Sequence, residues 1–298
     1  MTVPAPIALS PSSRSGQRPR DDELDLHGLT HTGLVREENE DTFLLCTVHP
    51  QVVVHATNLP EPADLAQRGQ RLATIMLVAD GVGGSAAGSR ASRLATEAVT
   101  RYVASSLRCY HSAVASTAGE FEDTLRAAAI DAHEAVRSEA EATPEEAGMA
   151  TTLSLGIVVW PWLYVVQVGD SRCYLYHGGA LEQLTRDQTV AQDLVEQGVF
   201  TREVAKVSPL NNILSSAIGA TEAVPEVTRV DVRERGCVII LCTDGLTKHV
   251  SDAEIAEELG AMLSAEQACH ALLKLALDRG GSDNITLVVG RAVKREEP

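Results

Sequence analysis

The sequence predicts an α+β domain, in which antiparallel strands are combined with helices. Strand-like and helix-like segments are interleaved along the 298 residues, and we find no internal repeat. Three neighbouring strand-like segments, at 151–160, 163–168 and 172–176, are joined by connections too short to hold a helix. Because strands joined by short turns run antiparallel, we expect these three to form a meander rather than a βαβ unit.

Composition and charge exclude several classes of protein. Hydrophobic residues make up 44% of the chain and charged residues 22%, which is typical of a globular protein. The formal net charge of −16 argues against a nucleic-acid-binding protein, and no apolar stretch is long enough to span a membrane. The six cysteines show no C-x-x-C spacing, so we expect reduced thiols in a cytoplasmic protein. Cys237 and Cys242 should point to opposite faces of one strand.

The N-terminal residues differ in composition from the rest of the chain. Residues 1–22 contain Pro, Ser and Arg but no apolar segment, which predicts a flexible tail and no secretory signal. No second linker is apparent, so residues 23–298 are predicted to form a single domain.

The first half of that domain is predicted to contain short strands and two amphipathic helices. Apolar residues recur at helical spacing from 86 to 105 and from 120 to 142, and Thr143-Pro144 ends the second helix. Residues 49–72 are irregular and are predicted to be an inserted loop or hairpin. Strands are expected at 26–33, 42–46 and 74–79.

The second half is predicted to alternate strands with shorter helices. A helix at 189–197 is closed by Gly198, and Ser251 with Glu254 forms a capping box before another helix. Residues 201–221 are rich in Ser and Asn and are predicted to be a mobile flap that shapes substrate choice. A last helix is expected at 265–277, and strands at 227–232, 237–242 and 285–290.

Four aspartates, far apart in the sequence, each lie where an apolar run meets a loop. They are Asp80, Asp170, Asp244 and Asp283. Each alone is typical of an ordinary turn. If they converge at one sheet edge, their oxygens would suit Mg²⁺ or Mn²⁺ rather than zinc. Two such ions would relieve the repulsion between the carboxylates and activate a bridging water for in-line attack on phosphorus.

Other phosphate chemistries lack their motifs in this chain. No cysteine is followed six positions later by an arginine, which excludes the tyrosine-phosphatase type of nucleophile. No two aspartates are spaced as D-x-D, and no glycine precedes a lysine, which excludes the aspartyl-phosphate motif and the Walker phosphate loop.

Six motifs together resemble the metal-dependent protein serine/threonine phosphatase family (type 2C), in its short bacterial branch. Each motif alone is a weak pattern, but they follow the order of the family across residues 26–293. The motifs are Arg36-Glu37-Glu38-Asn39-Glu40-Asp41, Val78-Ala79-Asp80-Gly81-Val82-Gly83-Gly84, Gly148-Met149-Ala150-Thr151-Thr152, Val168-Gly169-Asp170-Ser171-Arg172, Leu241-Cys242-Thr243-Asp244-Gly245 and Asp283-Asn284-Ile285-Thr286.

This resemblance implies a four-layer αββα sandwich, with two antiparallel sheets flanked by helices and the metals at one end. It implies that Asp80 bridges two Mn²⁺ or Mg²⁺ ions, with the Gly81 carbonyl on one of them. Asp244 and Asp283 would bind the other ion. Asp170, together with Asp244, would hold a third and weaker ion; the alternative is that Asp170 only caps its turn through Ser171 and Arg172.

The resemblance also assigns roles around the ions. Arg36 would bind the substrate phosphate through its planar fork of donors, unless it only pairs with Glu37 or Glu40. Glu40 and the catalytic residue Asp41 would orient water on the ions, and Asn284 would support them. Many relatives have a histidine close after the Asp-Gly pair, proposed in some to protonate the leaving group. Here Val82 and Ser85 stand at those positions.

The implied activity is hydrolysis of phosphoserine and phosphothreonine in proteins, opposing a serine/threonine kinase. Expected partners are phosphorylated proteins, including such kinases or their substrates, and the protein is expected to act as a monomer. The alternative from another class is a weakly active or inactive regulatory protein on the same fold that binds a phosphorylated partner. A third hypothesis keeps the site but gives it a small phosphoester.

Overall fold

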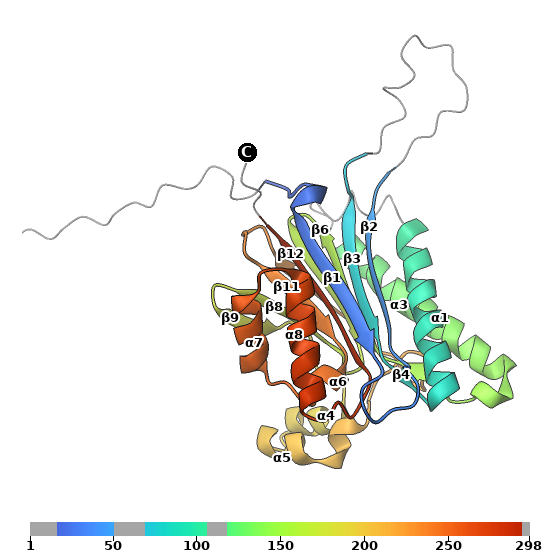
Figure 1. Ribbon diagram of the computed structural model, residues 1–298. Coiled ribbons are helices and arrows are strands. Elements are labelled where there is room, and N and C mark those ends of the chain that lie inside the picture. The colour runs from blue at the N-terminus through green and yellow to red at the C-terminus, as the bar shows by residue number, and fades with distance from the viewer. Residues whose placement is uncertain (1–16, 51–68, 106–117, 294–298) are drawn as a thin grey trace, which may run out of the picture.

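The chain forms two five-stranded antiparallel sheets that pack face to face (Figure 1). This computed structural model describes residues 17–50, 69–105 and 118–293. The first sheet contains, in spatial order, β1 (Leu24–His31), β12 (Ile285–Ala292), β11 (Val238–Cys242), β8 (Arg172–His177) and β9 (Ala180–Gln183). The second sheet contains β10 (Glu226–Asp231), β7 (Trp162–Val168), β6 (Leu153–Val159), β3 (Ala73–Ala79) and β2 (Thr42–Val48).

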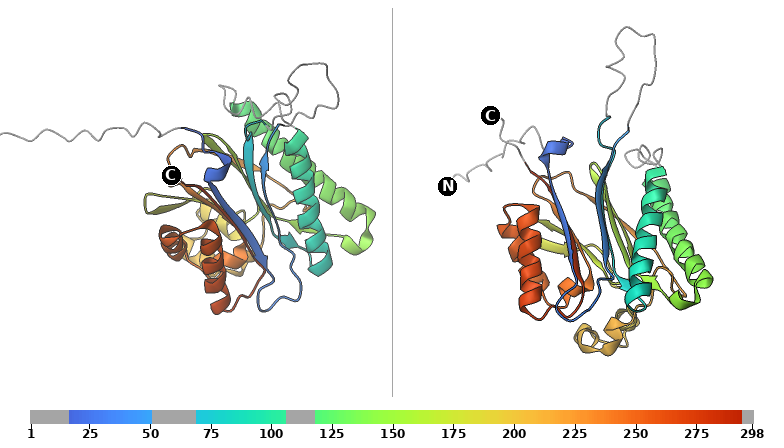
Figure 2. Two further views of the ribbon diagram at one scale, coloured as in Figure 1. Left: turned by 45° about the horizontal axis from the view of Figure 1, so that its top comes forward. Right: turned by 45° about the vertical axis from the view of Figure 1, so that its right-hand side comes forward.

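Helices cover the outer face of each sheet, which confirms the αββα sandwich (Figure 2). The second sheet is covered by α1 (Ser85–Ser105) and α3 (Ala118–Ala142), and the first by α7 (Asp252–Ala261) and α8 (Ala265–Asp278). At one end of the sandwich lie the short helices α4 (Val190–Glu196), α5 (Arg202–Val207) and α6 (Asp244–Thr247), and the small pair β4 (Gly81–Val82) and β5 (Ala150–Thr151). Single 3₁₀ turns are η1 (Asp21–Glu23), η3 (Pro144–Glu146) and η4 (Pro209–Asn212).

The β3 strand shows why the layers form. All seven of its residues are buried, because one face packs against the helices and the other against the opposite sheet. Ile75 and Leu77 belong to the core under α1 and α3, whereas Met76 and Val78 belong to the core between the sheets. Burying an aliphatic side chain of this size stabilises the fold by about 1.5–3 kcal/mol. A strand that is apolar on both faces therefore lies at the centre of the sandwich.

The predicted meander is wrong for its third strand. β6 and β7 pair antiparallel as expected, but β8 pairs with β11 and β9 in the other sheet. The turn that contains Gly169, with φ at 98°, carries the chain from one layer to the other. A short connection requires the ends of two strands to be close, but it does not require them to exchange hydrogen bonds.

The predicted flap contains regular structure that the sequence analysis missed. Residues 201–221 include α5 and η4, and the hydroxyls of Thr201 and Ser208 accept hydrogen bonds from the first turns of these helices. Ile218 exchanges two backbone hydrogen bonds of 2.9 Å with Thr151. The Ser and Thr residues that suggested an irregular segment therefore act partly as helix caps. The mobility of the segment stays a prediction.

The ordered fold begins before residue 23, inside the predicted tail. Arg71, only 7% exposed, donates to the Pro19 carbonyl at 2.8 Å and pairs with Asp21 at 2.5 Å. Residues 1–16 and most of the predicted insertion at 49–72 lie outside the described residues. In the part of the chain that is described, no helix is both long and apolar enough to cross a membrane.

The remaining predictions about elements and thiols are largely confirmed. The helices and strands begin and end within a few residues of the expected positions, and the Ser251 amide donates to Glu254 in the predicted capping box. The five cysteines of the described ranges are free thiols, and Cys109 lies outside those ranges. Cys237 and Cys242 pack into different cores, as opposite faces of the strand require.

Candidate metal centre

Strand register brings five aspartates from both sheets to one end of the sandwich. Thr42 pairs with Ala79, so Asp41 before β2 and Asp80 after β3 leave the second sheet together. In the first sheet, Cys242 pairs with both Arg172 and Leu287. In this sheet Asp170 precedes β8, Asp244 follows β11 and Asp283 precedes β12. The four aspartates predicted to converge do so, but at one end of two packed sheets rather than at the edge of one sheet.

Most of the predicted site residues line one open cleft of about 790 Å³. Arg36, Asp80, Asp170, Asp244 and Asp283 all face it, and residues 212–217 with 220–222 form one wall. Asp41 lies behind the cleft and is only 8% exposed. Of the remaining predicted residues, Gly81 begins β4, and Glu40 and Asn284 lie in the segments just before β2 and β12.

The backbone at Asp80 is held by two buried threonines. The Asp80 amide donates to the Thr152 hydroxyl at 2.9 Å, and the Asp80 carbonyl accepts from the Thr151 hydroxyl at 2.8 Å. The next residue must be glycine, because a Cβ at Gly81 would lie 2.3 Å from the Gly88 carbonyl oxygen. Thr151 and Thr152 therefore position the aspartate.

The turn at Asp244 is equally constrained. The buried Thr243 hydroxyl donates to Asp41 Oδ2 at 2.8 Å and accepts from the Thr286 amide at 3.1 Å. A Cβ at Gly245 would lie 1.8 Å from the Asn284 carbonyl oxygen, so only glycine fits there. Thr243 thus links an aspartate from each sheet, a contact that the sequence analysis did not foresee.

Asn284 organises the loop that carries Arg36 and Glu40. Its amide nitrogen donates to the carbonyls of Thr32 and Glu38, both at 2.9 Å, and its amide oxygen accepts from the Glu40 backbone at 2.8 Å. The loop between β1 and β2 is therefore fixed against the start of β12, next to Asp283. Asn284 therefore supports the site by holding this loop, and its own backbone amide donates to Asp283 Oδ1 at 3.0 Å.

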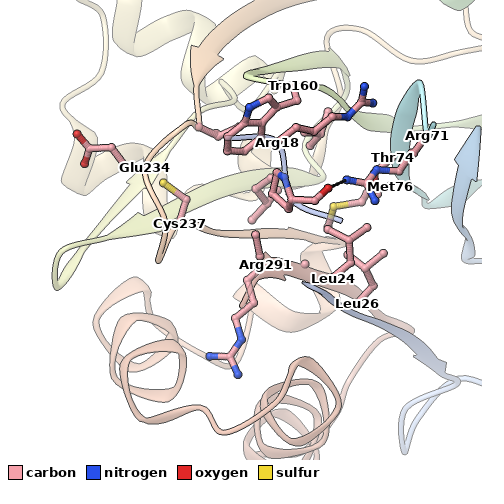
Figure 3. Close-up of a pocket in the computed structure, with 16 residues that line it drawn as sticks. Arg18, Leu24, Leu26, Arg71, Thr74, Met76, Trp160, Glu234, Cys237 and Arg291 are labelled. Carbon is pink, nitrogen blue, oxygen red and sulfur yellow. Dashed lines mark hydrogen bonds between the residues drawn. The ribbon is translucent and has the colours of Figure 1, made fainter. Parts of the chain in front are cut away.

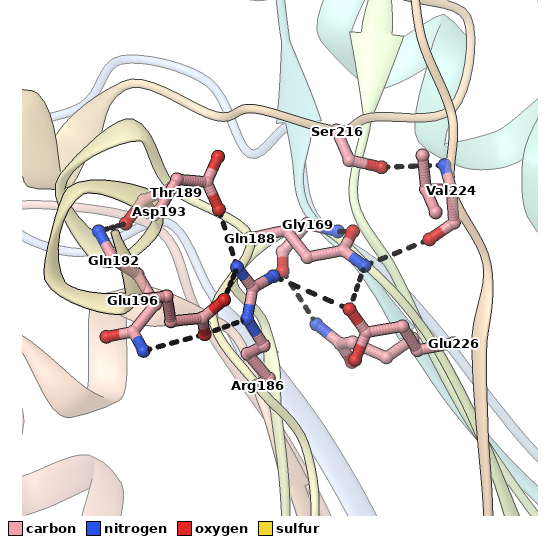
Figure 4. Close-up of polar contacts among 11 residues, drawn as sticks. Gly169, Arg186, Gln188, Thr189, Gln192, Asp193, Glu196, Ser216, Val224 and Glu226 are labelled. Carbon is pink, nitrogen blue, oxygen red and sulfur yellow. Dashed lines mark hydrogen bonds and ion pairs between the residues drawn. The ribbon is translucent and has the colours of Figure 1, made fainter. Parts of the chain in front are cut away.

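The Asp170 turn is held by glutamine side chains (Figure 4). Buried Gln188 exchanges hydrogen bonds with Gly169. Its side-chain oxygen accepts from the Gly169 amide, and its backbone amide donates to the Gly169 carbonyl, both at 2.9 Å. Arg172 pairs with Asp187 at 2.6 Å rather than with Asp170. Capping through Arg172 therefore does not explain Asp170. Nothing in the sequence pattern marked Gln188 as the residue that holds this turn.

A second network anchors α4 close to this turn. Arg186 pairs with Asp193 at 2.6 Å, with Glu196, and with Glu226 of β10 at 3.4 Å (Figure 4). The Gln188 amide also donates to the Val224 carbonyl at 2.9 Å. The wall of the cleft is therefore tied to the second sheet at its base.

Burial is the main cause of raised pKa values at three of the aspartates. It raises the pKa of Asp41 and of Asp170 to about 7, and the pKa of Asp80 well above its ordinary value of 3.8. At Asp170 the charges of Lys248 and Arg172 oppose this rise in pKa only in part. Repulsion from neighbouring carboxylates, including Asp244, raises these pKa values further. Asp41 Oδ1 and Asp244 Oδ1 are buried and have no hydrogen-bond partner. Bound cations would therefore relieve the repulsion between these carboxylates.

Two basic side chains compensate the other part of the cluster. Lys248 Nζ lies 2.6 Å from Asp244 Oδ2 and 2.7 Å from Asp283 Oδ2. Arg36 Nε lies 2.8 Å from Asp283 Oδ1, so its ion-pair partner is Asp283 and not Glu37 or Glu40. Although burial raises the pKa of Asp283, the hydrogen bonds and charges of Lys248 and Arg36 outweigh it, and the pKa is lowered. The sequence analysis missed Lys248; its only signal was its position four residues after Asp244.

The donor set fits a hard divalent cation. Carboxylate and carbonyl oxygens are the ligands that Mg²⁺ and Mn²⁺ prefer, and two buried carboxylate oxygens lack a partner. Within the described ranges, no three acidic, histidine or cysteine side chains are already gathered closely enough to hold one ion. Lys248 lies between two of the candidate ligands, so ion binding there requires that side chain to move.

A second and smaller cavity of about 60 Å³ lies at the opposite end of the sandwich (Figure 3). Its lining is mainly apolar, with Leu26, Met76 and Trp160, and it also includes Arg18 and Arg71. None of the predicted site residues lines it. The large cleft is therefore the candidate functional site.

The two packed sheets and the acidic cleft at their end define an αββα sandwich with a candidate centre for divalent cations. Residues 62–278 match the family described as Protein phosphatase 2C, and the chain belongs to this family.

The curated relatives bear related names. The serine/threonine protein phosphatase PstP of Mycobacterium tuberculosis is 37% identical over 221 residues, which cover 74% of this chain but 41% of PstP. The serine/threonine phosphatase stp of Listeria monocytogenes is 32% identical, over 72% of this chain and 83% of its own. A structure of the PstP catalytic domain in complex with two manganese ions has a TM-score of 0.69 at 31% identity, covering 91% of this chain and 99% of that one.

Proposed function

We propose that this protein hydrolyses phosphoserine and phosphothreonine in proteins with the help of Mn²⁺ or Mg²⁺. The observation that carries the proposal is the cleft in which aspartates from both sheets face Arg36 and Lys248. Membership of the protein phosphatase 2C family and the names of the relatives support it. Because the chain spans only 41% of the length of PstP, the activity of the whole protein is part of the proposal.

Two ions would be held by oxygens of the cleft. In our assignment Asp80 serves both ions, the Gly81 carbonyl serves one, and Asp244 with Asp283 serves the other. Asp170 and Asp244 would hold a third and weaker ion. The raised pKa values of Asp80 and Asp170 support this assignment, because they reflect negative charge without a cation. The two manganese ions in the PstP structure support the proposal that the site holds two ions.

The bound ions would supply Lewis-acid charge at the phosphate oxygens and an activated bridging water as nucleophile. Arg36, half exposed at the cleft, would bind the phosphate with its planar guanidinium, which Asp283 holds in place. Glu40 and Asp41 would orient the attacking water. The ester bond from phosphorus to the Ser or Thr oxygen breaks, and that oxygen takes up a proton. Val82 lines the cleft and cannot supply this proton.

The proposed substrates are phosphorylated proteins, including serine/threonine kinases or the proteins that such kinases modify. An open cleft of about 790 Å³ admits a side chain on a polypeptide rather than enclosing a small molecule. We propose further that the protein acts as a monomer in the cytoplasm.

The test measures phosphate release from a phosphothreonine peptide with millimolar Mn²⁺, with Mg²⁺ and after EDTA treatment. We expect metal-dependent release in the wild type and a loss of at least about a hundredfold in Asp80→Asn and Asp244→Asn, because each removes a carboxylate that we assign to the metal ions. Asp123→Asn, at an exposed position of α3, is the matched control and should retain full activity. Circular dichroism establishes that each variant is folded.

Each other outcome has a defined meaning. Full activity in a folded Asp80→Asn/Asp244→Asn double variant would overturn the proposal. Mn²⁺ binding by calorimetry without phosphate release would favour the regulatory protein that binds a phosphorylated partner. Release from p-nitrophenyl phosphate but not from the peptide would favour a small phosphoester as substrate.

A further inference from the structure

We propose that Lys248 is a built-in competitor of one of the two metal ions, and that the ions therefore bind with unequal affinity. The ammonium group contacts the same two carboxylates, Asp244 and Asp283, that are assigned to the second ion. The inference rests on the proposed function, because it presupposes metal binding at this cleft. It adds a residue that must be displaced before the site is fully loaded.

The contacts of Lys248 are those of a cation held between two ligands. Its Nζ atom lies 2.6 Å from Asp244 Oδ2 and 2.7 Å from Asp283 Oδ2, which are distances of charge-assisted hydrogen bonds. The backbone also holds the residue in position, because the Lys248 amide donates to the Asp244 carbonyl at 2.8 Å. The side chain is only 33% exposed, so solvent weakens these contacts less than it would on an open surface.

The two ligands of the second ion have few free oxygens. Arg36 Nε lies 2.8 Å from Asp283 Oδ1, and Lys248 contacts Asp283 Oδ2. Asp244 Oδ2 is engaged by Lys248, whereas Asp244 Oδ1 is buried without a partner. A divalent ion that binds Oδ2 of either carboxylate therefore competes directly with Lys248 for that oxygen.

The rest of the cluster presents no such competitor. In the described part of the chain, Asp41 and Asp80 form no ion pair with a basic side chain, and neither does Asp170. An ion held by Asp80 and the Gly81 carbonyl would replace repulsion between carboxylates with attraction. The first ion therefore binds where charge is uncompensated, and the second binds where a lysine has to leave.

The size of the effect follows from the strength of the contacts. A hydrogen bond between two charged groups is strong enough to shift an equilibrium by about tenfold or more. We expect removal of the Lys248 charge to tighten the weaker Mn²⁺ step by at least about tenfold. The tighter step should change by less, since no contact of Lys248 to Asp80 is broken.

The experiment titrates Mn²⁺ into the metal-free full chain by isothermal calorimetry. Lys248→Met keeps the apolar stem and removes the charge, whereas Lys248→Arg keeps the charge. The matched control is Lys274→Met, because Lys274 also pairs with an aspartate four residues away, Asp278, but on the exposed face of α8. The expected result is two unequal steps in the wild type, in Lys248→Arg and in Lys274→Met, and a tightened second step in Lys248→Met only.

A second readout is the melting temperature of the metal-free protein. Without metal, Lys248→Met leaves Asp244 and Asp283 with less compensation, so its melting temperature in EDTA should fall below that of the wild type. Millimolar Mn²⁺ should restore it to the wild-type value. If Lys248→Met does not fold, Lys248→Gln, which also lacks the charge, takes its place in both measurements.

The outcomes separate this inference from the proposed function. Two Mn²⁺ steps with the same affinities in the wild type and in Lys248→Met would overturn the competitor role and leave the metal-dependent function intact. Equal tightening in Lys274→Met would show a general charge effect and would also overturn it. No Mn²⁺ binding to any of the proteins would overturn the metal-dependent function itself, and the inference with it.

Discussion

Asp41 makes the metal-free protein less stable at neutral pH, and Asp41→Asn should relieve this. Burial raises the pKa of Asp41 from its ordinary value of 3.8 to about 7. Unfolding therefore releases a proton between these pH values, and the free energy of unfolding falls as pH rises from about 4 to about 7. The difference between the two pKa values corresponds to about 4 kcal/mol at pH 8.

The asparagine variant recovers part of that free energy. Its amide oxygen can still accept from the Thr243 hydroxyl, which now donates to Asp41 Oδ2 at 2.8 Å. Its amide N–H has no acceptor at the position of the unpartnered Asp41 Oδ1, at a cost of about 1–2 kcal/mol. A net gain of about 2 kcal/mol corresponds to a rise of about 4–8 °C in melting temperature for a chain of this size.

Scanning calorimetry in EDTA between pH 5 and pH 8 measures this difference. We expect the gain of Asp41→Asn to be largest at pH 8 and close to zero at pH 5, where Asp41 is protonated in the folded protein. Asp123→Asn should show no such pH dependence. Saturating Mn²⁺ should stabilise the wild type more than the variant. A melting temperature of Asp41→Asn at pH 8 that equals or lies below that of the wild type would refute the reasoning.

Two further predictions concern the turns that hold the site. Gly245→Ala places a Cβ 1.8 Å from the Asn284 carbonyl oxygen, so the start of β12 must shift and stability should fall by about 3 kcal/mol or more, measured by urea unfolding. An unchanged urea midpoint would contradict this. Gln188→Ala leaves the Gly169 amide without its 2.9 Å acceptor and should cost about 1–3 kcal/mol by thermal unfolding. Gln192→Ala, at a half-buried position of α4, is its control and should change stability less.

The elements of the fold could largely be predicted from the sequence, because each depends on a local pattern. The apolar run of β3 and the helical spacing in α1 and α3 are visible in single windows of sequence. The sheet to which β8 belongs was not predictable in this way. Its partner β11 lies more than sixty residues further along the chain, and the turn at Gly169 is compatible with either layer.

The acidic part of the site could be predicted for a similar reason. Asp80 directly follows the buried strand β3, and Asp244 lies two residues after the end of the buried strand β11. Such positions at the ends of apolar runs can be recognised in the sequence. Lys248 could not be predicted, because a lysine four residues after an aspartate is typical of an ordinary surface helix pair. Lys248 also contacts Asp283, and this contact depends on the pairing of β11 with β12 in the first sheet.

The origin of the aspartates in two different sheets has a consequence for assembly of the molecule. Asp41 and Asp80 leave one sheet, Asp244 and Asp283 leave the other, and Asp170 lies on the crossing between them. Neither sheet alone carries all of the proposed ligands, and neither does any short fragment of the chain. The metal centre forms only after the two sheets have packed together, so high-affinity ion binding would occur late in folding. A divalent ion would then link the two sheets at one end of the sandwich.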